Sequence, residues 1–166
     1  LTITWSDVGM HANASIIDAE LALRRTDRDG EAIISVWTLD KAFDDQEANW
    51  TSNGLGLNWT DGGIDYIGES VGALNGNQST PWMAYDLTYI IQERLRAGDH
   101  SDLHLMVRGY GGAGENITIG SSEEALEYLP KLTVNYDWGD GVSPSPGQDL
   151  TPRDGGGAWT QTEGNL

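Results

Sequence analysis

The chain has 166 residues, enough for one domain that buries about two thirds of the surface exposed by its unfolded form. It carries 9 lysines and arginines against 26 aspartates and glutamates, a formal net charge of −17, and no cysteine. A field of that sign repels phosphate backbones and anionic membrane surfaces, so we expect no nucleic-acid partner. Because no run of 18 apolar residues occurs, we also expect no membrane span.

Three strands are predicted near the start of the chain, where apolar and polar side chains alternate. The alternating segments are 1–5, 16–23 and 32–39. A hairpin turn is predicted at 27–30, because Gly30 can adopt the positive φ that such turns need. We therefore expect the three strands to form an antiparallel meander.

A long connection is predicted for residues 44–78, which contain seven glycines and only short apolar islands. Loops held by a rigid scaffold often carry binding residues. We expect ligand contacts to lie in this segment.

One short helix is predicted between Asp86 and Gly98. Asp86 supplies an N-cap, Ile91 and Leu95 recur at helical spacing, and Gly98 suits the residue after the helix. Strand alternation returns at 103–108 and 132–136, which predicts two further half-buried strands.

Proline, glycine and serine dominate residues 138–166, so we expect a linker or a docked C-terminal arm after a domain at 1–137. The predicted fold is all-β: a jelly-roll-like antiparallel β-sandwich with one short helix and a Pro/Gly-rich C-terminal tail.

Several short motifs occur in the order found in one family. They are Ala14-Ser-Ile-Ile-Asp-Ala-Glu-Leu21, Phe43-Asp-Asp-Gln-Glu-Ala-Asn-Trp50, Trp82-Met-Ala-Tyr-Asp-Leu-Thr88, Ile117-Thr-Ile-Gly-Ser-Ser-Glu123 and Pro130-Lys-Leu-Thr-Val-Asn-Tyr136. Over residues 1–137 the chain resembles the DNRLRE domain, a group that includes carbohydrate-binding module family 96. The resemblance implies a non-catalytic glycan-binding sandwich. This sequence departs from the family in lacking one or two strands before Leu1, and in having Asn49 where the family usually has Thr.

Five Asn-X-Ser/Thr triplets are present, against roughly one or two expected by chance. The excess predicts an extracellular, glycosylated protein, although asparagine and threonine are also common in β-protein turns. The five candidate asparagines are Asn13, Asn49, Asn58, Asn77 and Asn116.

Aromatic rings are the usual platforms for sugars, because a pyranose face packs on a π surface while its hydroxyls reach polar groups. The predicted ligand-binding residues combine rings in Gly-rich segments with nearby charges: Trp59, Tyr66, Tyr110, Asp61, Asp65 and Arg108. The alternative for these rings is ordinary loop packing. By contrast, Trp5, Trp37 and Trp82 fall in phase with aliphatic residues and are predicted to pack in the core.

Asp44, Asp45 and Glu47 could coordinate calcium, since a hard cation takes clustered carboxylate oxygens. Their spacing is not that of an EF-hand loop, and a solvated acidic turn is the alternative. No other cofactor is predicted.

Catalysis is not predicted, because the chain has no thiol, no nucleophile elbow and only scattered histidines. Cleavage of glycosidic bonds by a pair of carboxylates stays an alternative, because it depends on the distance between the two groups in the folded chain.

Two functions are therefore expected. The first is a carbohydrate-binding or adhesive module of a larger secreted protein, and the strongly acidic surface favours neutral glycans as its ligands. The alternative is a structural subunit of an extracellular filament, sheath, surface layer or virion that assembles by strand or tail exchange.

Overall fold

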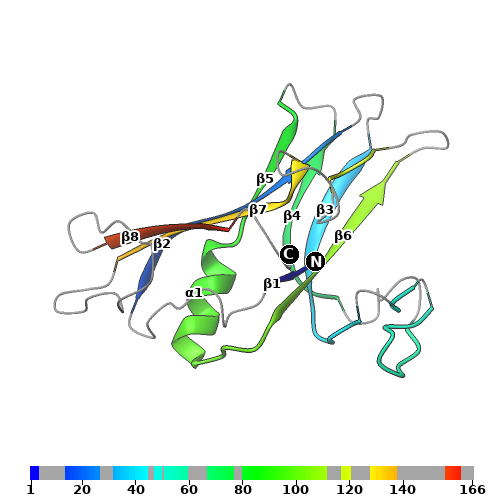
Figure 1. The fold of residues 1–166 in the computed structure, drawn as a ribbon, viewed down its shortest axis with the longest axis horizontal. Coiled ribbons are helices and arrows are strands. Elements are labelled where there is room, and N and C mark those ends of the chain that lie inside the picture. The colour runs from blue at the N-terminus through cyan, green and yellow to red at the C-terminus, as the bar shows by residue number, and fades with distance from the viewer. Residues whose placement is uncertain are drawn as a thin grey trace.

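A computed structural model gives the fold as two packed antiparallel sheets with one short helix (Figure 1). The structure describes residues 1–3, 14–26, 32–44, 47–49, 51–59, 67–76, 80–111, 117–120 and 128–137, and the backbone of 156–161. The predicted antiparallel β-sandwich is confirmed.

Each sheet contains four strands. The first sheet has the order β1 (Thr2–Ile3), β6 (Leu103–Tyr110), β3 (Ile33–Leu39) and β4 (Ile67–Asn75). The second has the order β5 (Trp82–Asp86), β2 (Ser15–Arg24), β7 (Lys131–Asp137) and β8 (Gly156–Gln161). All neighbouring strands pair antiparallel.

Alternate residues of the strands face inward and form one core. Leu21 and Leu23 of β2 and Val134 of β7 meet Val36 of β3 and Leu105 of β6, and all five are at most 1% exposed. The period-2 pattern of the sequence therefore identified the buried faces of β6 and β7.

The helix α1 (Thr88–Ala97) follows β5 directly and covers the part of β2 that β5 does not reach. Thr88 Oγ1 accepts a hydrogen bond from the Ala19 amide at 2.9 Å, and Gln92 Oε1 accepts one from the Ile16 amide at 2.8 Å. Ile91 and Leu95 are buried beneath the helix. The helix thus satisfies backbone groups that an open strand edge would leave unpaired.

The ends of α1 match the sequence only in part. Gly98 follows the helix as predicted and has φ 65°, and the amides of Gly98 and Asp99 bond to the carbonyls of Leu95 and Arg94, which completes a Schellman motif. The predicted N-cap is wrong by one residue. Leu87 occupies that position, while Asp86 Oδ1 accepts from the Thr88 amide at 2.8 Å.

The predicted meander is wrong, because β2 and β3 lie in different sheets and their connection crosses between them. The predicted long connection at 44–78 is wrong in its last third, which forms β4 on the outer edge of the first sheet. Alternation shows which side of a strand is buried but not which strand is its partner.

Part of the predicted C-terminal arm is a strand on the chain's own second sheet. Its backbone pairs with β7 in the register Val134↔Trp159. The remaining positions, 138–155 and 162–166, lie outside the described residues.

The predicted core positions of two tryptophans are wrong. Trp37 is half-buried on the outer face of β3, where its indole N–H donates to Ser35 Oγ at 3.0 Å. Trp82 is half-buried under two cations, with Lys131 Nζ 4.3 Å and Arg24 Cζ 5.7 Å from its ring centroid. Trp5 lies outside the described residues.

Candidate functional site

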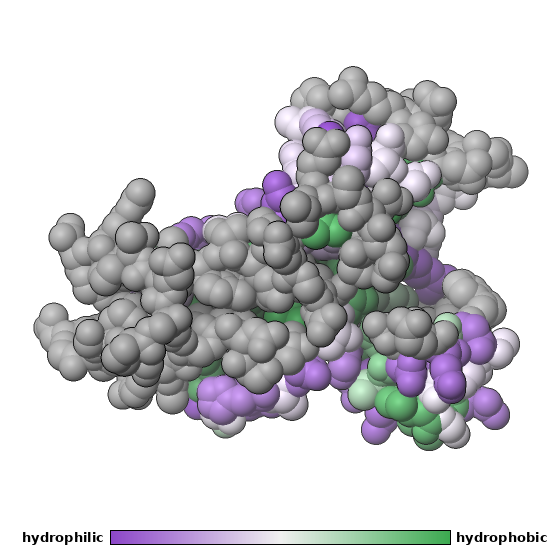
Figure 2. Space-filling model, viewed as in Figure 1, coloured by the Kyte–Doolittle hydropathy of each residue, from purple (hydrophilic) through white to green (hydrophobic). Residues whose placement is uncertain are grey.

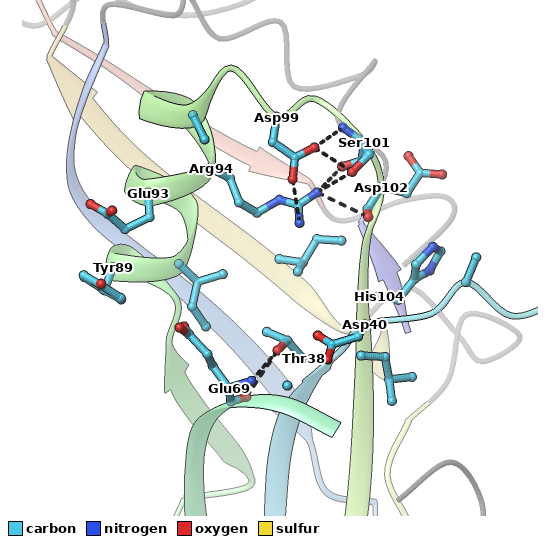
Figure 3. A pocket seen from close by; sticks show the side chains of 16 residues that line it. Thr38, Asp40, Glu69, Tyr89, Glu93, Arg94, Asp99, Ser101, Asp102 and His104 are labelled. Carbon is cyan, nitrogen blue, oxygen red and sulfur yellow. Dashed lines mark hydrogen bonds and ion pairs between the residues drawn. The ribbon is translucent and has the colours of Figure 1, made fainter. Parts of the chain in front are cut away.

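A cleft of about 870 Å³ lies between α1 and the ends of β3, β4 and β6 (Figure 3). Its apolar lining includes Leu39, Ile90 and Leu103. The labelled polar side chains stand around this lining: Tyr89 and Glu93 on the helix side, Asp99, Ser101 and Asp102 on the α1–β6 connection, Asp40 and His104 opposite, and Thr38 and Glu69 at the bottom of the view.

The close approach of β4 to β3 at the cleft depends on a glycine. A Cβ atom on Gly68 would lie 2.5 Å from Thr38 Oγ1 and 2.6 Å from Asp40 Oδ1, which is closer than side-chain carbons pack. Thr38 Oγ1 accepts from the Glu69 amide at 2.7 Å. Glycine at this position therefore leaves room beside β4 for the Thr38 and Asp40 side chains, and Asp40 and Glu69 both line the cleft.

The wall formed by the α1–β6 connection is held by Arg94. Its guanidinium pairs with Asp99 at 3.2 Å and donates to the Ser101 carbonyl, to Ser101 Oγ at 3.0 Å and to the Asp102 carbonyl at 3.3 Å. Asp99 Oδ1 in turn accepts from the Ser101 hydroxyl at 2.6 Å and from its amide at 3.0 Å. These bonds from Ser101, chiefly from its hydroxyl, lower the pKa of Asp99, and the Arg94 charge adds to the effect.

The charge of the cleft is strongly negative, because five carboxylates and one arginine line it. Arg94 neutralises Asp99, and Glu93 pairs with Arg96 at 2.7 Å. Within the described part of the chain, Asp40, Glu69 and Asp102 form no ion pair, and no group of three acidic or histidine side chains is close enough to hold a metal ion. The carboxylates of Asp40, Glu69 and Asp102 therefore offer hydrogen-bond acceptors to a ligand.

His104 faces the cleft from β6 and has a partly desolvated ring. Its Nδ1 lies 3.1 Å from Thr2 Oγ1, and its ring meets Phe43 edge to face with the centroids 5.5 Å apart. Burial is the main cause that lowers the pKa of His104, and the nearby Asp102 carboxylate only partly opposes it. We therefore expect a neutral imidazole at neutral pH.

The described members of the sequence-predicted ligand set, Trp59, Arg108 and Tyr110, do not line this cleft. Arg108 and Tyr110 lie together on β6, with the guanidinium 4.9 Å from the ring centroid, on the outer face of the first sheet. Trp59 lies in a separate apolar pocket with Phe43 and Met106, and its indole N–H donates to the Asn49 carbonyl at 2.7 Å. Tyr66, Asp61 and Asp65 lie outside the described residues.

The calcium candidates are only partly described. Asp44 Oδ1 accepts from the Glu47 amide at 3.2 Å, so this carboxylate stabilises the turn that follows it. Asp45 lies outside the described residues. Calcium binding at this turn stays a prediction.

Two of the predicted glycosylation sites lie among the described residues. Asn49 and Asn58 are both exposed, and Asn49 Oδ1 accepts from the Thr51 amide and the Thr51 hydroxyl, each at 3.0 Å. Asn13, Asn77 and Asn116 lie outside the described residues.

Sequence reasoning missed the cleft residues because they come from separate segments that only the fold brings together. Tyr89 and Glu93 are spaced by one helical turn, which places them on one face of α1, and this spacing was the available signal. Asp40 and Glu69 carried no such signal, since the sequence did not show β3 and β4 to be neighbours.

Comparison with known proteins identifies no relative: no family model, no curated protein and no solved structure matches the chain. Among the described residues no helix is long and apolar enough to cross a membrane.

Proposed function

We propose that this chain is a non-catalytic glycan-binding domain of an extracellular protein, and that the cleft beside α1 holds a neutral oligosaccharide. One observation carries the proposal, namely an open cleft of about 870 Å³ in which carboxylates surround an apolar lining. Cavities of about 300–1,000 Å³ accommodate drug-sized ligands, so this volume suits a short oligosaccharide.

The polar groups of the cleft match the chemistry of hydroxyl groups. Carboxylate oxygens only accept hydrogen bonds, and sugar hydroxyls readily donate them. Asp40, Glu69 and Asp102 supply such acceptors without an ion pair among the described residues. The same charges repel uronates, sulfates and phosphates, which makes a neutral glycan the better ligand.

An exposed aromatic ring supports stacking at the edge of the cleft. Tyr89 lines the cleft and is 67% exposed, although it lies on a helix whose other face is buried. One face of a pyranose presents C–H groups, and this face packs on an aromatic ring such as that of Tyr89. Tyr89 would thus supply the apolar contact and the carboxylates the polar ones.

The extracellular location and the non-catalytic role rest on the sequence. The five sequons favour a secreted protein, and Asn49 and Asn58 are exposed. The ordered motifs that resemble the DNRLRE domain add support for a glycan-binding module.

Calorimetric titration with a panel of neutral oligosaccharides tests the proposal. We expect Tyr89→Ala to weaken binding by about tenfold, the loss of a little over 1 kcal/mol for one stacked ring. Tyr110→Ala is the matched control, because Tyr110 is also an exposed tyrosine but lies on the outer face of β6.

Two outcomes would overturn the proposal. If Tyr110→Ala weakens binding and Tyr89→Ala does not, the ligand lies on the outer face beside Arg108 rather than in the cleft. If no neutral glycan binds at about 1 mM, the domain has another role.

A second function, as a subunit of an extracellular assembly, is favoured by a different observation. Leu55 and Leu57 are 56% and 42% exposed at the tip of one loop. Apolar side chains gathered at an exposed tip are typical of a contact surface. The isolated chain should then associate in solution, and a strict monomer in sedimentation would argue against this function.

A further inference from the structure

We infer that the loop tip formed by Leu55 and Leu57 in one copy of this chain docks into the apolar pocket around Phe43, Trp59 and Met106 of a second copy. The inference does not depend on glycan binding. Figure 2 shows hydrophobic surface over the 40–59 connection at the lower right, where this loop lies.

The loop that carries the leucines is held in one conformation by a buried asparagine. Asn53 is almost fully buried, and its Oδ1 accepts from the amides of Leu55 and Leu57, each at 3.0 Å. Asn53 Nδ2 donates to the Ala42 carbonyl at 3.0 Å. Gly54 and Gly56 adopt φ 79° and 88°, which the tight turn requires.

This geometry holds both leucines toward solvent before any partner binds. A flexible loop could fold its apolar side chains back onto the domain, but these backbone bonds fix the tip. A contact surface that is ordered in advance loses little conformational entropy on association. The loop therefore has the properties of a preformed docking element.

The receiving surface is a pocket of about 240 Å³ between the same segment of the chain and β6. Its lining is apolar except for Asn49, and the aromatic rings of Phe43 and Trp59 contribute to it together with Leu39, Leu105 and Met106. The volume is below the range of typical small-molecule sites. It suits one or two aliphatic side chains.

A second copy is the occupant that the chain itself provides. Leucine tip and pocket are complementary in size and polarity, and the tip and most of the pocket lining belong to the segment 39–59. Because each copy carries both, two copies related by a two-fold axis can fill both pockets, and other arrangements give open chains.

Salt dependence distinguishes this occupant from a cationic partner. Two copies with a formal net charge of −17 each repel one another, and salt screens that repulsion. Self-association should therefore strengthen as salt rises, whereas binding to a cationic partner should weaken.

The test is sedimentation velocity of the full chain over a range of concentrations in about 0.1 M and about 2 M NaCl. We expect reversible association that is stronger in high salt and that falls at least about tenfold in Leu55→Ser/Leu57→Ser. Ile17→Ser is the matched control, because Ile17 is 66% exposed on β2, in the other sheet, and its replacement should change nothing.

A variant of the pocket tests the docking inference independently of the loop tip. Ala48→Leu places extra atoms in the pocket, and it should lower association while the loop tip stays intact. Mixing it with Leu55→Ser/Leu57→Ser should restore one docked contact, because one variant keeps its pocket and the other keeps its leucines. Circular dichroism confirms that each variant is folded.

Three results would overturn the inference. They are a monomer at every concentration and salt, association that Leu55→Ser/Leu57→Ser leaves unchanged, and a mixture that associates no better than its two components alone.

Discussion

Replacing Arg94 by methionine should destabilise the domain far more than the same replacement at Arg96, two residues further along α1. Both arginines form an ion pair, but their surroundings differ. The Arg94 side chain is 20% exposed and also bonds to the backbone of Ser101 and Asp102, whereas the Arg96 side chain is 67% exposed and contacts only Glu93 in the described structure.

The difference can be estimated from these contacts. Asp99 is 40% exposed, so solvent screening limits its ion pair with Arg94 to about 0.5 kcal/mol. The charge-assisted bonds to the two carbonyls together add about 1.5 kcal/mol, the low end for bonds to a charged group, because Ser101 and Asp102 are exposed and water can replace the guanidinium there. We expect Arg94→Met to lower the free energy of unfolding by about 2 kcal/mol and Arg96→Met by less than about 0.5 kcal/mol.

Urea unfolding followed by tryptophan fluorescence measures both values. Methionine keeps the apolar stem of the side chain, so the measured loss reports the guanidinium. If the cleft wall depends on Arg94, the oligosaccharide affinity should fall in Arg94→Met and persist in Arg96→Met. Equal losses of stability in the two variants would refute the assignment of Arg94 as the residue that fixes this wall.

Three further changes test the packing and the electrostatics. Gly98→Ala should cost about 1 kcal/mol and lower the helical signal in circular dichroism, because alanine is strained at φ 65°; an unchanged stability would mean that the helix end relaxes. Tyr85→Phe should cost about 1 kcal/mol in urea unfolding, because the buried hydroxyl donates to the Ile34 carbonyl of the opposite sheet at 3.0 Å. Burial raises the pKa of Tyr85 to about 12, so this hydroxyl stays protonated, and the loss should be the same at pH 7 and pH 9. The pKa of His104 is lowered from 6.5 in the folded chain, so the unfolded chain binds the imidazole proton more tightly. The contribution of His104 to the free energy of unfolding is therefore complete above pH 6.5 and decreases as the pH falls below that value. His104→Gln should remove this part of the pH dependence of unfolding.

The sequence predicted the layers of the fold better than its connections. Alternation along β6 and β7 identified the core faces because one side of each strand is buried, whereas on β3 it placed Trp37 on the wrong face. The edge strand β4 was missed, since its glycines and half-exposed side chains resemble a loop. Pairing could not be predicted, because partners such as Val36 and Val107 are far apart in the chain.

The candidate cleft was beyond sequence reasoning for the same reason. Its lining comes from the end of β3, the start of β4, the exposed face of α1 and the first residues of β6. Asp40 and Glu69 are two of many acidic residues, and nothing local distinguishes them. Trp59 was conspicuous as an aromatic ring in a Gly-rich segment, yet its position in a small apolar pocket depends on Met106 of β6.

The two proposed contacts are physically connected through the segment that follows β3. Leu39 lines both the cleft and the apolar pocket, while Asp40 and Ala42 line the cleft and Phe43 lines the pocket. Docking of a second copy against Phe43 would restrain the backbone that holds Asp40. Because coupling between two binding events is reciprocal, any factor by which docking changes glycan affinity is the factor by which the glycan changes docking.

This coupling gives a final expectation that needs no new variant. We expect a glycan that binds the cleft to bind more tightly above the protein concentration at which the chain associates, because the restrained segment then loses less entropy on binding. Calorimetric titration at two protein concentrations measures the factor, and Leu55→Ser/Leu57→Ser should abolish the difference. Equal glycan affinities for the associated and the single wild-type chain would show that the cleft and the pocket act independently, even though Leu39 lines both.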